Sequence, residues 1–230
     1  MKLYDPTLMT LTDTLDDIEG LRIATQNRLR IMISQEEDKD GQVRGFGLPH
    51  DNPVVKLQRD MLGHLLEIEK NVIKAVQKKM KEHPLGPWIS RQKGVGEKQA
   101  ARLLAAIGDP YWNSLHDRPR TVSELWAYCG MSVVDGKAQR RQKGVKSNWS
   151  NTAKMRARLI AESCLKNRAS PYRRFYDETR EKYKDAEITD LHSHNRGLRK
   201  MTKQFLKDLW RESKRIYQEG EHVEEVVSVP

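Results

Sequence analysis

Apolar residues recur at helical spacing along an extended stretch of the chain, and this periodicity constrains the fold more than any other feature. Asn52 and Pro53 stand where an N-cap and a first helical residue are expected, and His83-Pro84 ends the pattern. A second helix is expected over residues 10–34, with Thr10 and Asp13 as its capping start. One face of the helix after Pro53 carries Leu57, Met61, Leu65, Ile68, Val72, Val76 and Met80.

Residues 36–51 between these helices form an acidic loop that contains glycine. Two long helices joined by a loop predict a helical hairpin or coiled coil over residues 1–84. Such a hairpin either packs on itself or serves as a dimerisation stalk, and the pattern leaves both interpretations open.

A glycine-containing bend follows in the segment Gln92–Leu104, where Gly94 and Gly96 flank Val95 ahead of an amphipathic run. Glycine tolerates the backbone angles of a tight turn and leaves its amide groups bare. Bare N–H groups at a helix N-terminus bind phosphate oxygens. The pattern resembles the hairpin of a helix-hairpin-helix module, although a purely structural turn is the alternative. A dinucleotide-binding turn is excluded because no strand-like run precedes the glycines.

The remaining chain also has helical patterns, and we predict an all-α fold with one short strand hairpin near residues 133–137. Helices are expected over 84–92, from Glu97 to Gly108, and over 123–129. Further helices are expected after Ser150, after Ser170-Pro171 and over 196–217. The expected organisation is a hairpin over 1–84, a multi-helix domain over 85–218 and a flexible acidic tail over 219–230.

Charge is distributed unevenly along the chain, whose formal net charge is +10. Residues 1–84 hold 13 Lys/Arg and 14 Asp/Glu, whereas residues 91–174 hold 18 Lys/Arg and only 6 Asp/Glu. This concentration predicts a polyanion as partner. No apolar stretch approaches 18 residues and the N-terminus lacks a leader-like core, so neither membrane insertion nor secretion is expected. Cys129 and Cys164 lack zinc or disulfide spacing, which favours the cytoplasm, in association with the nucleoid of a bacterial host.

Candidate nucleic-acid contacts gather in three segments of this basic region. Trp149 follows the second segment and either stacks on a base or packs on the next helix. His192 and His194 lack the partners of a metal site, so no metal or other cofactor is expected. The candidates are Lys93, Gly94, Val95, Gly96, Lys98 and Arg102 around the bend; Lys137, Arg140, Arg141, Lys143 and Lys146 in the basic loop; and Lys154 and Arg158 on the next helix.

From about Lys93 to Arg215 the chain resembles the C-terminal half of a transposase family. These insertion-sequence transposases pair an RNase-H-like acidic domain with a serine-bearing C-terminal domain, and some are guided by a bridging RNA. The resemblance runs through Gly94-Val95-Gly96, Leu104–Asp109, Ser123–Met131, Gly136-Lys137, Lys143–Lys146 and Asn151–Arg158.

Two departures from that family bear on activity. The chain has no room for the RNase-H-like domain, and Asp135 stands before Gly136 where the family carries its nucleophilic serine. A carboxylate there cannot form the serine linkage to a phosphodiester.

The sequence therefore predicts a non-enzymatic, largely sequence-tolerant DNA-binding protein of phage or mobile-element type, without catalytic residues. It is expected to bind double-stranded DNA and to dimerise or oligomerise through its N-terminal helices. Two alternatives stay open: a recombinase subunit that uses Ser132 with a separate metal-binding partner, and a structured-RNA-binding protein.

Overall fold

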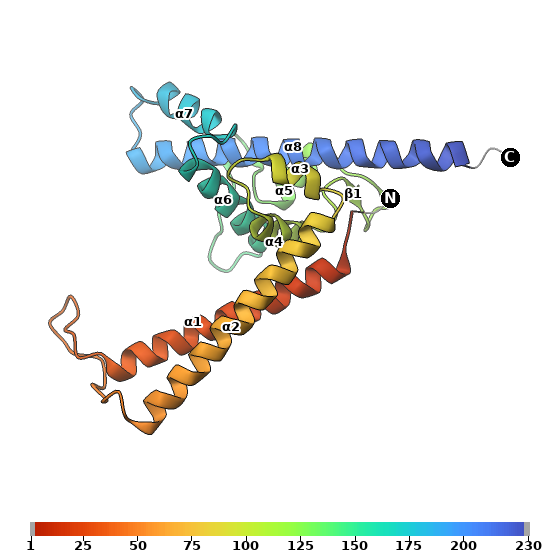
Figure 1. Cartoon of the computed structure of the whole chain (residues 1–230). Helices are drawn as coiled ribbons and strands as arrows, with labels where there is room; N and C mark the ends of the chain where they lie inside the picture. Colours follow the sequence, from red (N-terminus) through yellow and green to blue (C-terminus); the bar gives the residue numbers. More distant parts are fainter. Residues whose placement is uncertain (1–2, 228–230) are drawn as a thin grey trace. The chain divides into compact units, whose positions relative to one another are not determined.

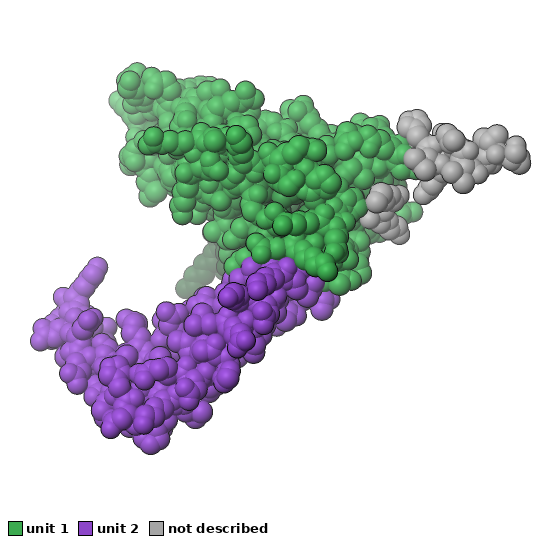
Figure 2. Space-filling view, viewed as in Figure 1, with its two compact units in different colours: residues 1–9, 77–230 green, residues 10–76 purple. Residues whose placement is uncertain are grey.

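A computed structural model describes the backbone of residues 3–227 and the side chains of residues 3–220. Within these ranges the chain forms eight helices and two antiparallel pairs of two-residue strands, so the predicted all-α class is confirmed (Figure 1). None of the described helices combines the length and apolarity needed to span a bilayer. The chain divides into two compact units, residues 10–76 and residues 1–9 together with 77–230 (Figure 2).

The first unit is built from most of two long helices, α1 (Pro6–Ile33) and α2 (Pro53–Glu82). The predicted cap of α2 is confirmed, because the side-chain oxygen of Asn52 accepts a hydrogen bond of 2.9 Å from the Val54 amide. Arg22 and Glu69 form a half-buried ion pair that joins the two helices. The unit is therefore a helical hairpin, as the periodicity predicted.

Helix α1 begins earlier than the sequence indicated. It starts at Pro6, with the carboxylate of Asp5 accepting hydrogen bonds from the amides of Thr7 and Leu8. Asp5 followed by Pro6 is a cap signal of the same kind as Asn52-Pro53, and it outweighs the one expected at Thr10.

The apolar face predicted for α2 is only partly buried. Val76 and Met80 are fully buried, whereas Leu57, Met61 and Ile68 are between 40% and 57% exposed. The face that carries Glu69, the ion-pair partner of Arg22 on α1, also carries the fully buried Val55 and Val76. The exposed stripe is thus unused within the described chain.

The second unit contains the remaining helices and both strand pairs. Short strands β1 (Trp112–Asn113) and β2 (Arg118–Pro119) form one pair, and β3 (Val133–Val134) and β4 (Lys137–Ala138) form the other. The β3–β4 hairpin lies where the sequence predicted one. The helices are α3 (Gly86–Arg91), α4 (Glu97–Ile107), α5 (Val122–Tyr128), α6 (Asn151–Lys166), α7 (Arg173–Lys182) and α8 (Asp190–Val227).

Helix α6 forms as its sequence predicts, with the Ser150 hydroxyl accepting a hydrogen bond from the Ala153 amide. Helix α8 is longer than predicted at both ends. It begins at Asp190 and continues to Val227. Most of the segment expected as a flexible tail is therefore helical, and residues 228–230 of that tail lie outside the described part. The predicted core face of α8 is buried: Leu198, Met201, Phe205, Leu209 and Ile216.

Both ends of residues 1–84, the segment predicted to form the hairpin, belong instead to the second unit. The His83 ring donates to the carbonyl of Leu3, and the Leu3 amide donates to Asp109. Tyr217 also donates to the same Asp109 carboxylate, at 2.5 Å. These buried contacts explain why residues 1–9 and 77–84 group with the multi-helix domain rather than with the hairpin.

Candidate nucleic-acid interface

The glycine bend lies between α3 and α4, as predicted, and Gly94 adopts a φ of +92°. A Cβ at Gly94 would lie 3.0 Å from the Cα of Cys164 and 3.3 Å from the Cβ of Asn167, at the end of α6. Glycine is thus required here by close packing on α6. Gly96 differs, since it is exposed, caps α4 and has open space where a Cβ would lie.

Two of the residues assigned to this bend do not belong to a surface site. The Val95 amide donates to the carbonyl of Gln92 within the turn, and the Val95 side chain is buried. Arg102 is only 4% exposed, because its position on α4 faces the core. We therefore remove Val95 and Arg102 from the candidate interface, while Lys93 stays exposed and Lys98 is half-buried.

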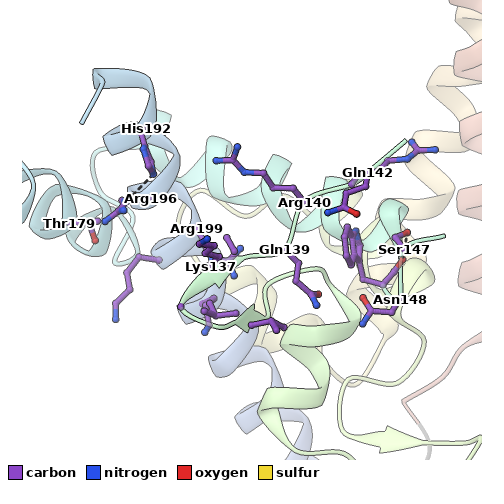
Figure 3. Close-up of a pocket in the computed structure, with 18 of the residues that line it drawn as sticks. Lys137, Gln139, Arg140, Gln142, Ser147, Asn148, Thr179, His192, Arg196 and Arg199 are labelled. Atoms are coloured by element: carbon purple, nitrogen blue, oxygen red, sulfur yellow. Dashed lines mark hydrogen bonds between the residues drawn. The ribbon is translucent and has the colours of Figure 1, made fainter. Parts of the chain in front are cut away.

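A larger candidate site is a cavity of about 1160 Å³ near the other end of α6. One part of its lining comes from the β3–β4 hairpin and the chain that follows it up to Trp149. The other part comes from the end of α7 and the first turns of α8. Figure 3 shows Arg196 and Arg199 of α8 around the same cavity as Lys137 of β4 and Arg140 of the loop that follows β4. We call this cavity the basic groove.

The described residues that line the groove include many cations and no carboxylate. Among the described residues, nine Lys or Arg and no Asp or Glu line it. Unopposed like charges repel one another, and a polyanion would relieve that repulsion. The nine are Lys137, Arg140, Arg141, Lys146, Lys182, Arg196, Arg199, Lys200 and Lys203.

Four of these nine were predicted from the sequence, and five were missed. Lys143 lies exposed in the same loop but outside the lining, and the predicted Lys154 and Arg158 line a smaller adjoining cavity. The missed cations come from α7 and α8. A signal for four of them exists, since Arg196, Arg199, Lys200 and Lys203 follow the i, i+3, i+4, i+7 spacing of one helix face.

Burial and mutual repulsion disfavour the charged forms of the half-buried cations in this region. Burial lowers the pKa of Lys154, Arg199 and Lys203 below their ordinary values, and the charge of Arg199 lowers the pKa of both lysines further. Arg199 also donates to the carbonyls of Met131 and Ser132, at 2.7 and 2.8 Å. It therefore fixes the start of the β3–β4 hairpin to α8 while it contributes charge to the groove.

Aromatic rings lie beside the cations. The Lys154 ammonium stands 4.7 Å from the centre of the Trp149 ring, and a Cβ at Gly130 would lie 2.8 Å from that ring. Trp149 thus packs on Gly130 and on α6, which is the packing role that the sequence left open against base stacking. The guanidinium of Arg196 stands 4.5 Å from the centre of the Tyr183 ring.

The residues considered for catalysis or metal binding have ordinary partners. The Ser132 hydroxyl donates to the side chain of Gln139 at 2.7 Å, and Asp135 occupies the β3–β4 turn with a φ of +50°. His194 bonds to the Tyr176 hydroxyl, and His192 accepts from Arg196. Across the described part of the chain, His, Cys, Asp and Glu form no group of three placed to hold a metal ion.

Comparisons with protein-family models, with curated proteins and with solved structures find no match to this chain. The transposase resemblance and the candidate function therefore rest on the motifs and on the site geometry.

Proposed function

We propose that this protein is a non-enzymatic, largely sequence-tolerant DNA-binding protein that holds the sugar-phosphate backbone in the basic groove. The observation that carries the proposal is the lining of the groove, with nine cations and no carboxylate among the described residues. Neutralising phosphates with Lys and Arg releases counterions and supplies most non-specific affinity. Contacts of this kind position a protein on DNA without reading its bases.

Sequence tolerance follows from the type and placement of the cations. Lys137, Arg140, Arg141 and Lys146 project from an exposed hairpin and loop rather than from a helix shaped to enter a major groove. Long, flexible side chains on such a loop adapt to phosphates along any sequence. Lys93 and the exposed start of α4 at Gly96 form a second candidate phosphate contact, near the C-terminal end of α6. Because α6 has 16 residues and rises about 1.5 Å per residue, its two ends lie roughly 24 Å apart.

A titration of DNA binding at several salt concentrations tests the proposal. The affinity should fall steeply with salt, with a log–log slope of about −0.9 per phosphate neutralised. Arg141→Ala should weaken binding to all sequences alike and reduce the magnitude of the slope by about 1. Arg28→Ala, the same change at an exposed position on α1, serves as the control and should leave the slope unchanged.

Four results would contradict the proposal. Flat salt dependence would reject the backbone groove, and a sequence-selective loss in Arg141→Ala would reject sequence tolerance. Stronger competition by a hairpin RNA than by duplex DNA of equal length would favour structured RNA as the partner. A covalent protein–DNA adduct that disappears in Ser132→Ala would replace the proposal by the recombinase alternative.

We further propose that two copies associate through α2. In the heptad register with Met61 and Ile68 at a positions, every a and d position from residue 54 to residue 78 is exposed. All four a positions and the first d position, Leu57, are apolar, whereas the later d positions carry His64, Asn71 and Lys78. The g positions carry Asp60, Glu67, Lys74 and Lys81. An antiparallel pair of α2 helices aligns Glu67 with Lys74 and Asp60 with Lys81 of the second copy. In a parallel pair, where a g position faces the e position of the next heptad, Lys74 faces Lys79 of the second copy. Charge complementarity therefore favours the antiparallel dimer.

A further inference from the structure

A second cavity of about 560 Å³ adjoins the basic groove, with Arg140, Arg196 and Arg199 in the lining of both. Its lining differs in character because it includes the apolar side chains of Leu191 and Leu198. Leu198 is buried in the core, whereas Leu191 is 68% exposed. The cavity thus combines an apolar wall with a cationic rim.

Binding of a phosphate group does not by itself explain why an apolar wall and a cationic rim occur together in this cavity. A phosphate group is small and strongly hydrated, and an apolar wall offers it nothing. A cavity of a few hundred cubic ångströms with apolar walls and a few fixed polar groups is typical of sites for organic ligands. A nucleobase has two apolar faces and a hydrogen-bonding edge, and it is the part of a polynucleotide that matches such a wall.

The polar groups of the cavity are held in place by other contacts. The Asn195 carboxamide donates to the carbonyl of Leu191 at 2.9 Å and accepts from Arg158 at 3.1 Å. The Thr202 hydroxyl donates to the carbonyl of Leu198 at 2.8 Å. Lys154 is positioned over Trp149. The Thr202 oxygen has used its one hydrogen and is left only to accept. Asn195 keeps a second N–H, and Arg158 and Lys154 keep further N–H groups, and these donors suit the acceptor atoms on the edge of a base.

We propose that the smaller cavity takes one unstacked base from a strand whose phosphates lie in the basic groove. This inference rests on the proposed function, because the groove must first hold the strand. Taking a base out of a duplex costs a few kcal/mol, and the cost is least where the base is unpaired or mismatched. The protein should therefore prefer DNA with a bulged or mismatched nucleotide over a perfect duplex, whatever the flanking sequence.

Fluorescence of 2-aminopurine tests the inference on the full chain. The probe is quenched while stacked, so a duplex with 2-aminopurine at a single-nucleotide bulge should brighten when the protein saturates it. The bulged duplex should also bind about tenfold more tightly than the perfect duplex, since part of the unstacking cost is already met. Leu191→Asn removes apolar wall at an exposed position, and it should abolish the brightening at saturation. Leu115→Asn makes the same change at a leucine that is 92% exposed and lines neither cavity, and it should behave as the wild type.

The outcomes separate this inference from the proposed function. Salt-dependent binding without brightening, and with equal affinity for bulged and perfect duplexes, would overturn the base site while the groove stands. Brightening that persists in Leu191→Asn would place the unstacked base elsewhere and would also overturn it. Absence of salt-dependent binding would reject the groove itself, and the base site with it.

Discussion

Gly94 shows at the scale of one residue that the glycine bend has a structural role. Its φ of +92° disfavours any side chain, and a Cβ would press on the backbone of α6 at 3.0 Å. Gly94→Ala should therefore lower the free energy of unfolding by about 1–3 kcal/mol. Chemical denaturation of the purified protein measures this change.

Gly96→Ala is the matched control for that substitution within the same turn. Gly96 has a φ of −87° and open space at the Cβ position, so the change should cost no more than about 1 kcal/mol, as expected for alanine at an N-cap. Equal losses at the two glycines would contradict the close packing of the bend on α6. If α4 also anchors phosphate, Gly96→Ala should weaken DNA binding modestly while the fold is kept.

Lys203 gives the groove a pH dependence. Burial lowers its pKa, and the charges of Arg199 and Lys200 lower it further below the ordinary value of 10.5. The protonated ammonium attracts phosphate and the neutral amine does not, so wild-type affinity should begin to fall at a pH below that value. Lys203→Arg keeps its charge at every pH used and should hold its affinity to higher pH. Binding titrations from pH 7 to pH 10 measure both curves, and coincident curves would show that Lys203 does not contact the polyanion.

Helices are the scale at which the sequence predicted the structure best. The Asn52-Pro53 and Ser150 caps and the core face of α8 are where their patterns placed them, since each depends on residues close in sequence. The basic groove was only half predicted. The cations of its hairpin and loop form a dense local run, but the α8 cations lie fifty or more residues later. Only the packing of α8 beside the β3–β4 hairpin brings the two sets together. Burial of Arg102 likewise depends on which face of α4 meets the core, and the basic spacing alone does not fix that face.

Helix α2 carries a prediction about charge pairs between copies. In the antiparallel arrangement Glu67 faces Lys74 of the second copy, so Glu67→Lys should oppose two lysines and shift the protein toward monomer. Lys74→Glu should do the same with the opposite charge. The double variant restores opposite charges and should associate as the wild type does. Sedimentation analysis over a range of concentrations measures these shifts.

Ile68→Ala is a second test of the same helix, because it removes apolar surface from the exposed stripe without touching a charge. Ile68 is 47% exposed, so the hairpin itself should stay folded while association weakens. Dimers that persist in both Glu67→Lys and Ile68→Ala would place the association on another surface.

For the whole molecule, the dimer and the groove together predict how affinity depends on DNA length. Each copy contributes the basic groove of its described residues, so we expect a dimer to hold a long duplex at the grooves of both copies. The second contact is then intramolecular, and avidity can raise the apparent affinity by about 100-fold or more without any new contact. A short oligonucleotide that reaches only one groove gains nothing from the second copy. The wild type should therefore bind a long duplex far more tightly than a short one, beyond the statistical gain in sites. Glu67→Lys should bind the short oligonucleotide as the wild type does and lose most of the advantage on the long one. If both proteins show the same ratio of long to short affinity, measured at one salt concentration, the two grooves do not act on one DNA molecule.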